Sequence, residues 1–212
     1  MNIVIIGLPG SGKGTQADIL AQKLGLFHFS AGELARELAQ TDSRIKALVQ
    51  SGALIPDEEM TGYVSAYLEK NVPSGKNILF EGYPRFVKQY KYLINWLKER
   101  EQKIQKIIFL EVEKEEVIKR LSTRRTCRQC EKVYNLVTNP PPKTGNCECG
   151  GELFQRNDDT AAAIEKRFAV FKQNVQPLID YLQLQGRLTR VDGSRSIPVV
   201  TKAILEIIRQ DD

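Results

Sequence analysis

A glycine-rich segment near the start of the chain has the composition of a phosphate-binding loop. It reads Gly7-Leu8-Pro9-Gly10-Ser11-Gly12-Lys13-Gly14-Thr15, between a short apolar stretch and a helical pattern. Such glycines let backbone N–H groups converge on phosphate oxygens, a helix N-terminus adds positive potential, and Lys13 adds a mobile charge. The segment departs from the general motif G-x-x-x-x-G-K-[ST], because Gly14 precedes the expected hydroxyl residue, Thr15. We predict phosphate binding here rather than a purely structural turn.

Four clustered cysteines are a second chemical signal. Cys127-x-x-Cys130 is followed, after sixteen residues, by Cys147-x-Cys149, and the chain has no other cysteine. In a chain without a secretion signal this clustering indicates a metal before a disulfide, and two pairs on turns fit tetrahedral structural zinc. The second pair is one residue shorter than C-x-x-C, so the usual turn cannot form unchanged. Reduced thiols, or three cysteines with a fourth ligand from elsewhere, are the alternatives.

Composition and charge limit the class of protein. The 212 residues are 42% hydrophobic and 27% charged, which suits one large domain with a small insertion. The net charge is +5, but Lys and Glu are mixed along the chain, so polyanionic small molecules are a better match than nucleic acid. No segment resembles a signal peptide or a membrane span of about 18 apolar residues, so we expect a cytoplasmic location and no membrane partner.

The hydrophobic pattern alternates between short strands and helices. Strands are expected at residues 2–6, 27–30, 77–80, 106–112 and 188–191. Helices are expected at 13–24, 33–40, 43–51, 56–70, 87–101 and 115–125, from 159 onward, and at 197–209. This alternation predicts an α/β fold with a doubly wound, parallel five-stranded sheet and helices on both faces. The glycine loop, Ser30, Glu81 and Asp192 end strands and should therefore meet at one rim of the sheet.

Three motifs together resemble the adenylate kinase family in its long form, which carries a LID insertion. They are the segment from Gly7 to Gln16, the segment Glu81-Gly82-Tyr83-Pro84-Arg85, and the segment Gln155-Arg156-Asn157-Asp158-Asp159. The resemblance covers essentially the whole chain, and Gly14-Thr15 is the form that nucleoside monophosphate kinases use. It implies a P-loop core of residues 1–29, 56–122 and 161–212, an NMP-binding segment of residues 30–55, and a zinc-ribbon-like LID of residues 123–160.

The resemblance implies reversible transfer of the terminal phosphoryl group of MgATP to AMP, which gives two ADP. ATP and AMP would be the partners of a monomer, with Mg²⁺ bound alongside the nucleotide. Structural Zn²⁺ would be held by Cys127, Cys130, Cys147 and Cys149. The catalytic residues would be Lys13, Arg85, Arg124, Arg156 and Arg167.

The resemblance also assigns residues to the two nucleotides. ATP would be bound by Gly10, Ser11, Gly12, Lys13, Gly14, Thr15, Arg124, Val133, Tyr134 and Arg195. AMP would be bound by Ala31, Arg36, Ala53, Leu54, Ile55, Gly82, Tyr83, Pro84, Arg85, Gln89, Arg156 and Arg167. Taken singly, each arginine better fits a solvated helix face, but a guanidinium within a matched motif suits bidentate phosphate contact. Arg120 stays open between the two readings, and Tyr134 could equally be a core residue of the insertion.

Two positions depart from the family pattern. Ala31 stands where a threonine is usual, which removes a hydroxyl near the acceptor base and is also found in pyrimidine monophosphate kinases. Gln89 and the long LID favour AMP. Glu81 replaces an aspartate that orients magnesium through water, so its longer side chain must shift the water shell or pull back. The open alternatives are a UMP or CMP kinase, a GTP-dependent AMP kinase, and a P-loop zinc-ribbon protein that binds nucleic acid.

Overall fold

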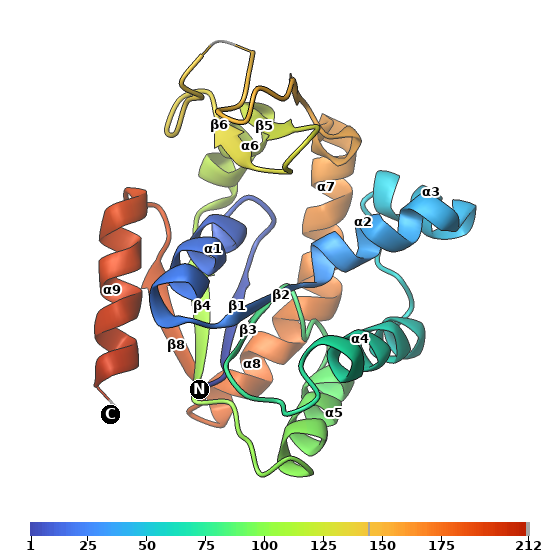
Figure 1. Cartoon of the computed structure of the whole chain (residues 1–212), viewed down its shortest axis with the longest axis vertical. Helices are drawn as coiled ribbons and strands as arrows, with labels where there is room; N and C mark the ends of the chain where they lie inside the picture. Colours follow the sequence, from blue (N-terminus) through green and yellow to red (C-terminus); the bar gives the residue numbers. More distant parts are fainter. Residues whose placement is uncertain (144, 211–212) are drawn as a thin grey trace.

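A parallel five-stranded sheet forms the centre of the computed structural model, which describes residues 1–143 and 145–210 (Figure 1). The strands are β1 (Ile3–Gly7), β2 (Phe27–Ser30), β3 (Ile78–Glu81), β4 (Lys106–Glu111) and β8 (Leu188–Asp192), and their order is β2-β3-β1-β4-β8. The predicted doubly wound α/β sheet is thereby confirmed. Apolar runs form these strands because the sheet is covered on both faces.

Helices cover the two faces of the sheet because successive strand side chains point to opposite sides. Ile3 and Ile5 pack in one cluster with α1 (Lys13–Leu24) and α9 (Ile197–Arg209). Val4 lies on the opposite face, where its side chain packs in a second cluster that includes residues of three further helices. These are α4 (Asp57–Asn71), α5 (Val87–Lys98) and α8 (Gln176–Leu184).

Two segments extend beyond the rim at which the strands end. The first is the helix pair α2 (Ala31–Thr41) and α3 (Ser43–Gln50), which projects to one side of the sheet (Figure 1). The second contains a small antiparallel sheet above the rim, in the order β6-β5-β7. Its strands are β5 (Arg124–Cys127), β6 (Val133–Asn135) and β7 (Leu153–Phe154). We call residues 123–160 the LID.

The connections to the LID differ from the expected helices. α6 (Lys114–Ser122) ends three residues earlier than predicted, and Arg124 begins β5 instead. Pairing of Arg124 with Asn135 in β6 gives this segment an alternative to the helical hydrogen bonds. On the return, a 3₁₀ turn, η1 (Asn157–Asp159), precedes α7 (Ala161–Val170), and a π-helical turn, η2 (Phe171–Val175), joins α7 to α8.

Local capping explains several of the boundaries. Ser30 caps α2 by accepting a hydrogen bond from the backbone N–H of Glu33 at 3.3 Å. Thr160 caps α7 in the same way, through the N–H of Ala163 at 3.3 Å, so the helix cannot begin at the predicted Asp159. Among the described helices, none has the length and apolar character required to cross a membrane.

Asn2 fastens the start of β1 to two loops at the opposite end of the sheet. Its side chain is fully buried, and Nδ2 donates hydrogen bonds to the carbonyl oxygens of Gly75 at 2.8 Å and Lys103 at 3.2 Å. Its Oδ1 accepts one from the N–H of Ile78 at 2.9 Å. One amide thus satisfies three backbone groups that strand pairing leaves free.

We predict that Asn2→Ala lowers the free energy of unfolding by roughly 2–4 kcal/mol, because buried backbone groups lose their partners. Urea denaturation measures this change. The matched control is Asn71→Ala, which removes a single exposed hydrogen bond to the Tyr67 carbonyl and should change the free energy by no more than about 0.5 kcal/mol. Equal losses in the two variants would contradict the prediction.

Candidate active site

A cavity of ≈ 970 Å³ lies at the rim where the parallel strands end. The glycine loop, the strand ends, α2 and the LID all contribute to its wall. Parallel pairing places Ser30 opposite Glu81, so the polar ends of β2 and β3 enter the cavity together. This is the position at which open α/β sheets bind their ligands.

The glycine loop connects β1 to α1 and borders the cavity. Gly10 and Gly12 have φ values of 82° and 95°, which side-chain-bearing residues rarely adopt. A Cβ at Gly12 or Gly14 would meet no atom within 4 Å, so this part of the loop is open toward the cavity. Lys13 begins α1, and its Nζ donates a hydrogen bond to the Leu8 carbonyl at 2.9 Å.

Lys13 is held in an unfavourable electrostatic environment. Burial, opposed by the charge of Glu81 and reinforced by the positive charges of Arg85, Arg167 and Arg124, lowers its pKa from 10.5 to about 8. These groups come from four distant parts of the chain. Their convergence produces a positive centre at the mouth of the glycine loop.

The predicted arginines meet around this centre. Arg85, Arg124, Arg156 and Arg167 all line the cavity together with Lys13. Burial lowers the pKa of Arg85, Arg156 and Arg167. For Arg156 the pKa falls to about 10, which still leaves its guanidinium charged at neutral pH. Arg85 Nε donates to the Gly82 carbonyl at 2.7 Å, and Arg156 Nε donates to Thr126 Oγ1 at 2.9 Å.

Asp159 orients two of these arginines, a role that the sequence reading did not assign to it. Its carboxylate is fully buried and accepts hydrogen bonds from Arg124 Nε at 2.7 Å and Nη2 at 2.5 Å. Arg167 Nη1 lies 3.3 Å from the same carboxylate and 3.1 Å from Asp158. Asp159 belongs to the motif of residues 155–159, and membership of that motif was the sequence feature that could have identified it as a site residue.

Glu81, the departure from the family pattern, is tied to the neighbouring strand. Its Oε2 accepts a hydrogen bond from Ser30 Oγ at 2.8 Å. Although burial raises the pKa of this carboxyl, the Lys13 charge and the Ser30 hydrogen bond hold it below its usual value. The cavity therefore contains an ionised carboxylate beside the loop lysine.

Known proteins share this chain's sequence over nearly its whole length. A sequence model of the family described as adenylate kinase matches residues 5–187. The chain is 40% identical to the adenylate kinase of Archaeoglobus fulgidus, over 99% of each chain, and 38% identical to that of Bacillus licheniformis, over 98% of each. The chain belongs to the adenylate kinase family. This confirms the family expected from the three motifs, and its members are nucleoside monophosphate kinases.

Residues that the family resemblance assigned to the acceptor fall into two groups. Arg36, Ala53, Leu54, Gly82 and Pro84 line the cavity with Arg85, Arg156 and Arg167. Ala31, Ile55, Tyr83 and Gln89 are buried within the protein instead.

The side chain of Gln89 is buried and contacts the protein backbone. Its side chain is 1% exposed, and its Oε1 accepts a hydrogen bond from the backbone N–H of Arg85 at 2.8 Å. Since Arg85 itself lines the cavity, the amide of Gln89 positions the chain that carries this arginine. A direct contact with the acceptor base stays a prediction.

The residues that the resemblance assigned to ATP come from the glycine loop, the LID and the C-terminal part of the chain. Gly10 to Thr15, Val133 and Arg195 line the cavity, as does Arg120. Arg120 donates to the carbonyls of Gly193 at 2.8 Å and Ser194 at 3.0 Å, so it at least braces the segment that leads to Arg195. Tyr134 also contributes to the cavity wall, but its ring packs against Cys127 and Cys147 in the core of the LID.

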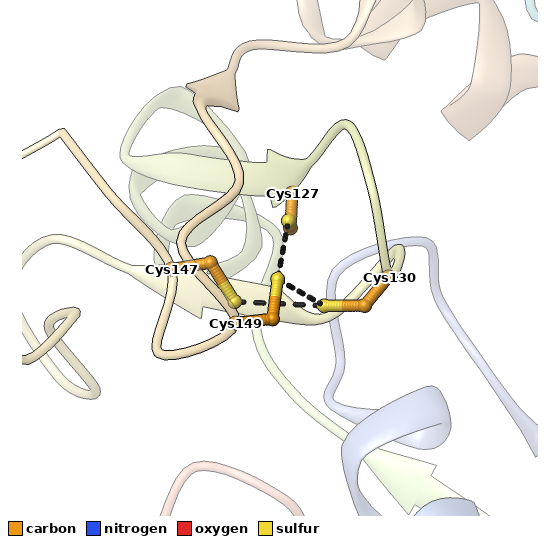
Figure 2. A group of neighbouring side chains, drawn as sticks. All are labelled: Cys127, Cys130, Cys147 and Cys149. Atoms are coloured by element: carbon orange, nitrogen blue, oxygen red, sulfur yellow. Dashed lines mark hydrogen bonds between the residues drawn. The ribbon is translucent and has the colours of Figure 1, made fainter.

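The four cysteine sulfurs converge at one end of the LID, as Figure 2 shows. All four Sγ atoms lie within 4.8 Å of one another, and the nearest pairs are 3.3–3.5 Å apart. Thiolates about 2.3 Å from a tetrahedral zinc would be about 3.8 Å apart, so the set fits such an ion despite the short second pair. The Tyr134 hydroxyl, 3.3 Å from Cys147 Sγ, makes the largest of several contributions that lower the pKa of that thiol to about 6. The neighbouring sulfurs raise the pKa of Cys130 and Cys149 instead, so without a metal the four thiols do not ionise together.

Lys13 should make nucleotide affinity depend on pH. A bound polyphosphate favours the charged lysine and raises its pKa above about 8, so the free protein takes up a proton on binding at higher pH. We predict that ATP affinity falls as pH rises from 8 toward 10, by up to about tenfold per unit. Calorimetry in buffers of different ionisation heat measures both effects.

Lys13→Arg is the control, because a guanidinium stays charged across this range. Its ATP affinity should stay level between pH 8 and 10, with no proton uptake at this site. Equal pH dependence in the variant and the original protein would contradict the assignment to Lys13.

Proposed function

We propose that the protein transfers the terminal phosphoryl group of ATP to AMP and returns two ADP. The observation that supports this most is the convergence of Lys13 with Arg85, Arg124 and Arg167, whose charges act on one another inside a single cavity. Phosphoryl transfer needs alignment and charge stabilisation more than covalent chemistry, and it proceeds in line without a covalent enzyme intermediate.

In this proposal each part of the cavity has a separate task. The loop from Gly10 to Thr15 and Arg124 hold the phosphates of ATP. Arg36 and Arg85 hold the phosphate of AMP. Arg156 and Arg167 stabilise charge on the group in transit, and Asp159 keeps Arg124 and Arg167 in position through its hydrogen bonds.

The LID and residues 30–55 would close over the two nucleotides and expel water. Gly52, which follows α3, lies against α7, because a Cβ at Gly52 would lie only 2.8 Å from Arg167 Cγ. The end of the NMP-binding segment, residues 30–55, thus packs directly against an arginine of the core. We further propose that the protein acts as a cytoplasmic monomer without a nucleic-acid partner.

Magnesium would enter with the nucleotide. The ionised carboxylate of Glu81 and the hydroxyl of Thr15 both line the cavity and offer the oxygen ligands, direct or through water, that this ion prefers. When bound, the ion neutralises charge on the bridged phosphates. The Ser30 hydrogen bond holds the longer Glu81 side chain toward β2, which is consistent with the expectation that it pulls back.

The four cysteines would hold structural zinc. The LID has a small apolar cluster of Cys127, Tyr134, Cys147 and Leu153, too little to fold by itself. The sulfurs lie farther apart than the roughly 2.05 Å of a disulfide bond, and all four are free thiols. A bound metal therefore accounts best for their convergence.

An acceptor panel tests the function. AMP should be phosphorylated with a higher kcat/KM than UMP or CMP, and Lys13→Met should lower kcat by at least roughly 10²–10³-fold while the protein stays folded. Ala31 is the residue that favours a pyrimidine acceptor, so a preference for UMP or CMP would replace AMP as the proposed acceptor. Turnover unaffected by Lys13→Met would overturn the mechanism.

Metal analysis of the purified protein tests the zinc site. We expect about one zinc per chain, and Cys149→Ser should weaken its retention and expose the LID to proteolysis while the core stays folded. Glu148→Gln is the control, because Glu148 lies between Cys147 and Cys149 but pairs with Lys132. The absence of metal from the original protein, or identical metal content in both variants, would refute the zinc assignment.

A further inference from the structure

Glu131 adopts a backbone conformation that glutamate rarely uses. It directly follows Cys130 in the turn between β5 and β6, and its φ is 57°. Its N–H donates to the Cys127 carbonyl at 3.2 Å, so the turn at the cysteine cluster fixes this conformation. Glycine would adopt it without a Cβ penalty, so the glutamate side chain needs a reason of its own.

The Glu131 side chain reaches from the LID to the NMP-binding segment, residues 30–55. Its Oε2 lies 3.4 Å from Nη2 of Arg36 in α2, and the side chains are 55% and 31% exposed. Among the described ion pairs, this is the one that Arg36 makes with a carboxylate. The contact joins residues 95 positions apart in the sequence, across the space between the two projecting segments.

The pair lies where the acceptor phosphate is proposed to bind. Arg36, Glu131 and Arg156 line both the main cavity and a smaller adjoining one of ≈ 200 Å³. Arg36 and Arg156 repel each other, since the charge of Arg36 contributes to the lowered pKa of Arg156. Glu33, on the same helix as Arg36, also feels its charge. The carboxylates of Asp158 and Asp159 act on Arg156, whereas Glu131 is the LID carboxylate that pairs with Arg36.

We propose that Glu131 is an exchangeable counter-ion for Arg36: it pairs with the arginine in the nucleotide-free protein and yields it to the acceptor's phosphate. Both groups are oxygen anions that offer a guanidinium the same hydrogen bonds, so they compete for one donor. The exchange links the acceptor site to the LID, because the released carboxylate is carried by the cysteine turn. The proposal rests on the proposed function, in which Arg36 binds the acceptor phosphate.

Removing the competitor should strengthen acceptor binding. Glu131→Gln keeps the side-chain size and should lower the Kd for AMP about two- to fivefold, the range expected for an exposed ion pair. The Kd for ATP should stay within twofold. The gain should shrink as salt screens the pair, and calorimetric titrations at about 0.05 M and 0.5 M salt measure it. Glu131→Gly should give the same gain.

Two controls separate the pair from general charge effects. Glu152→Gln removes another exposed LID carboxylate, one that pairs with Arg128 at 3.3 Å, and should leave the Kd for AMP unchanged. In an Arg36→Ala background, Glu131→Gln should bring no gain. Unchanged or weaker AMP binding in Glu131→Gln, or the same gain with Arg36 absent, would overturn the proposal.

The same titrations keep this inference separate from the proposed function. The original protein is titrated with AMP, UMP and CMP, and whichever monophosphate it binds becomes the probe, because the exchange concerns the phosphate and not the base. Binding of UMP in place of AMP would thus correct the acceptor while the Glu131 effect is still measured. Failure to bind any monophosphate would overturn both.

Discussion

The structure depends on holding several positive charges close together in a desolvated cavity. Four positive side chains interact electrostatically there: Lys13, Arg85, Arg124 and Arg167. The lowered pKa of Lys13 shows that its charged form is destabilised in the nucleotide-free protein. Two buried or part-buried carboxylates make the arrangement stable. Asp159 forms ion pairs with Arg124 and Arg167, and Glu81 interacts with the charge of Lys13. Buried charges persist only when they are paired in this way.

The sheet supplies the rigidity that such a cluster needs. Parallel pairing brings every strand's carboxyl end to the same rim, so residues from distant segments meet without long loops. Clusters of apolar side chains on both faces keep that rim in place. The LID, by contrast, has a small cluster built around two cysteines, and the proposed metal would add to it. A segment with few buried apolar contacts opens at lower free energy than a well-packed core, which agrees with the proposed closure of the LID.

Much of this fold could be predicted from local sequence, and the exceptions have identifiable causes. All five core strands and helices α1 and α9 follow from apolar runs and helical periodicity. Arg124 was misplaced in a helix because its strand exists only through pairing with β6. Gln89 was expected among the AMP-binding residues, and its burial against the backbone of Arg85 was not foreseen. Such pairings are tertiary, so periodicity cannot reveal them.

By itself, the sequence determined the chemistry that is available: a glycine loop with a lysine, arginines in three motifs, and four clustered cysteines. These are properties of residue type and spacing, which can be read from the sequence without coordinates. The tertiary structure alone decided which charges face each other. Asp159 could orient Arg124, Glu81 could bond to Ser30, and Glu131 could reach Arg36 only after folding brought them within a few ångströms. Electrostatic energy depends on distance and burial, and neither is written in the order of residues.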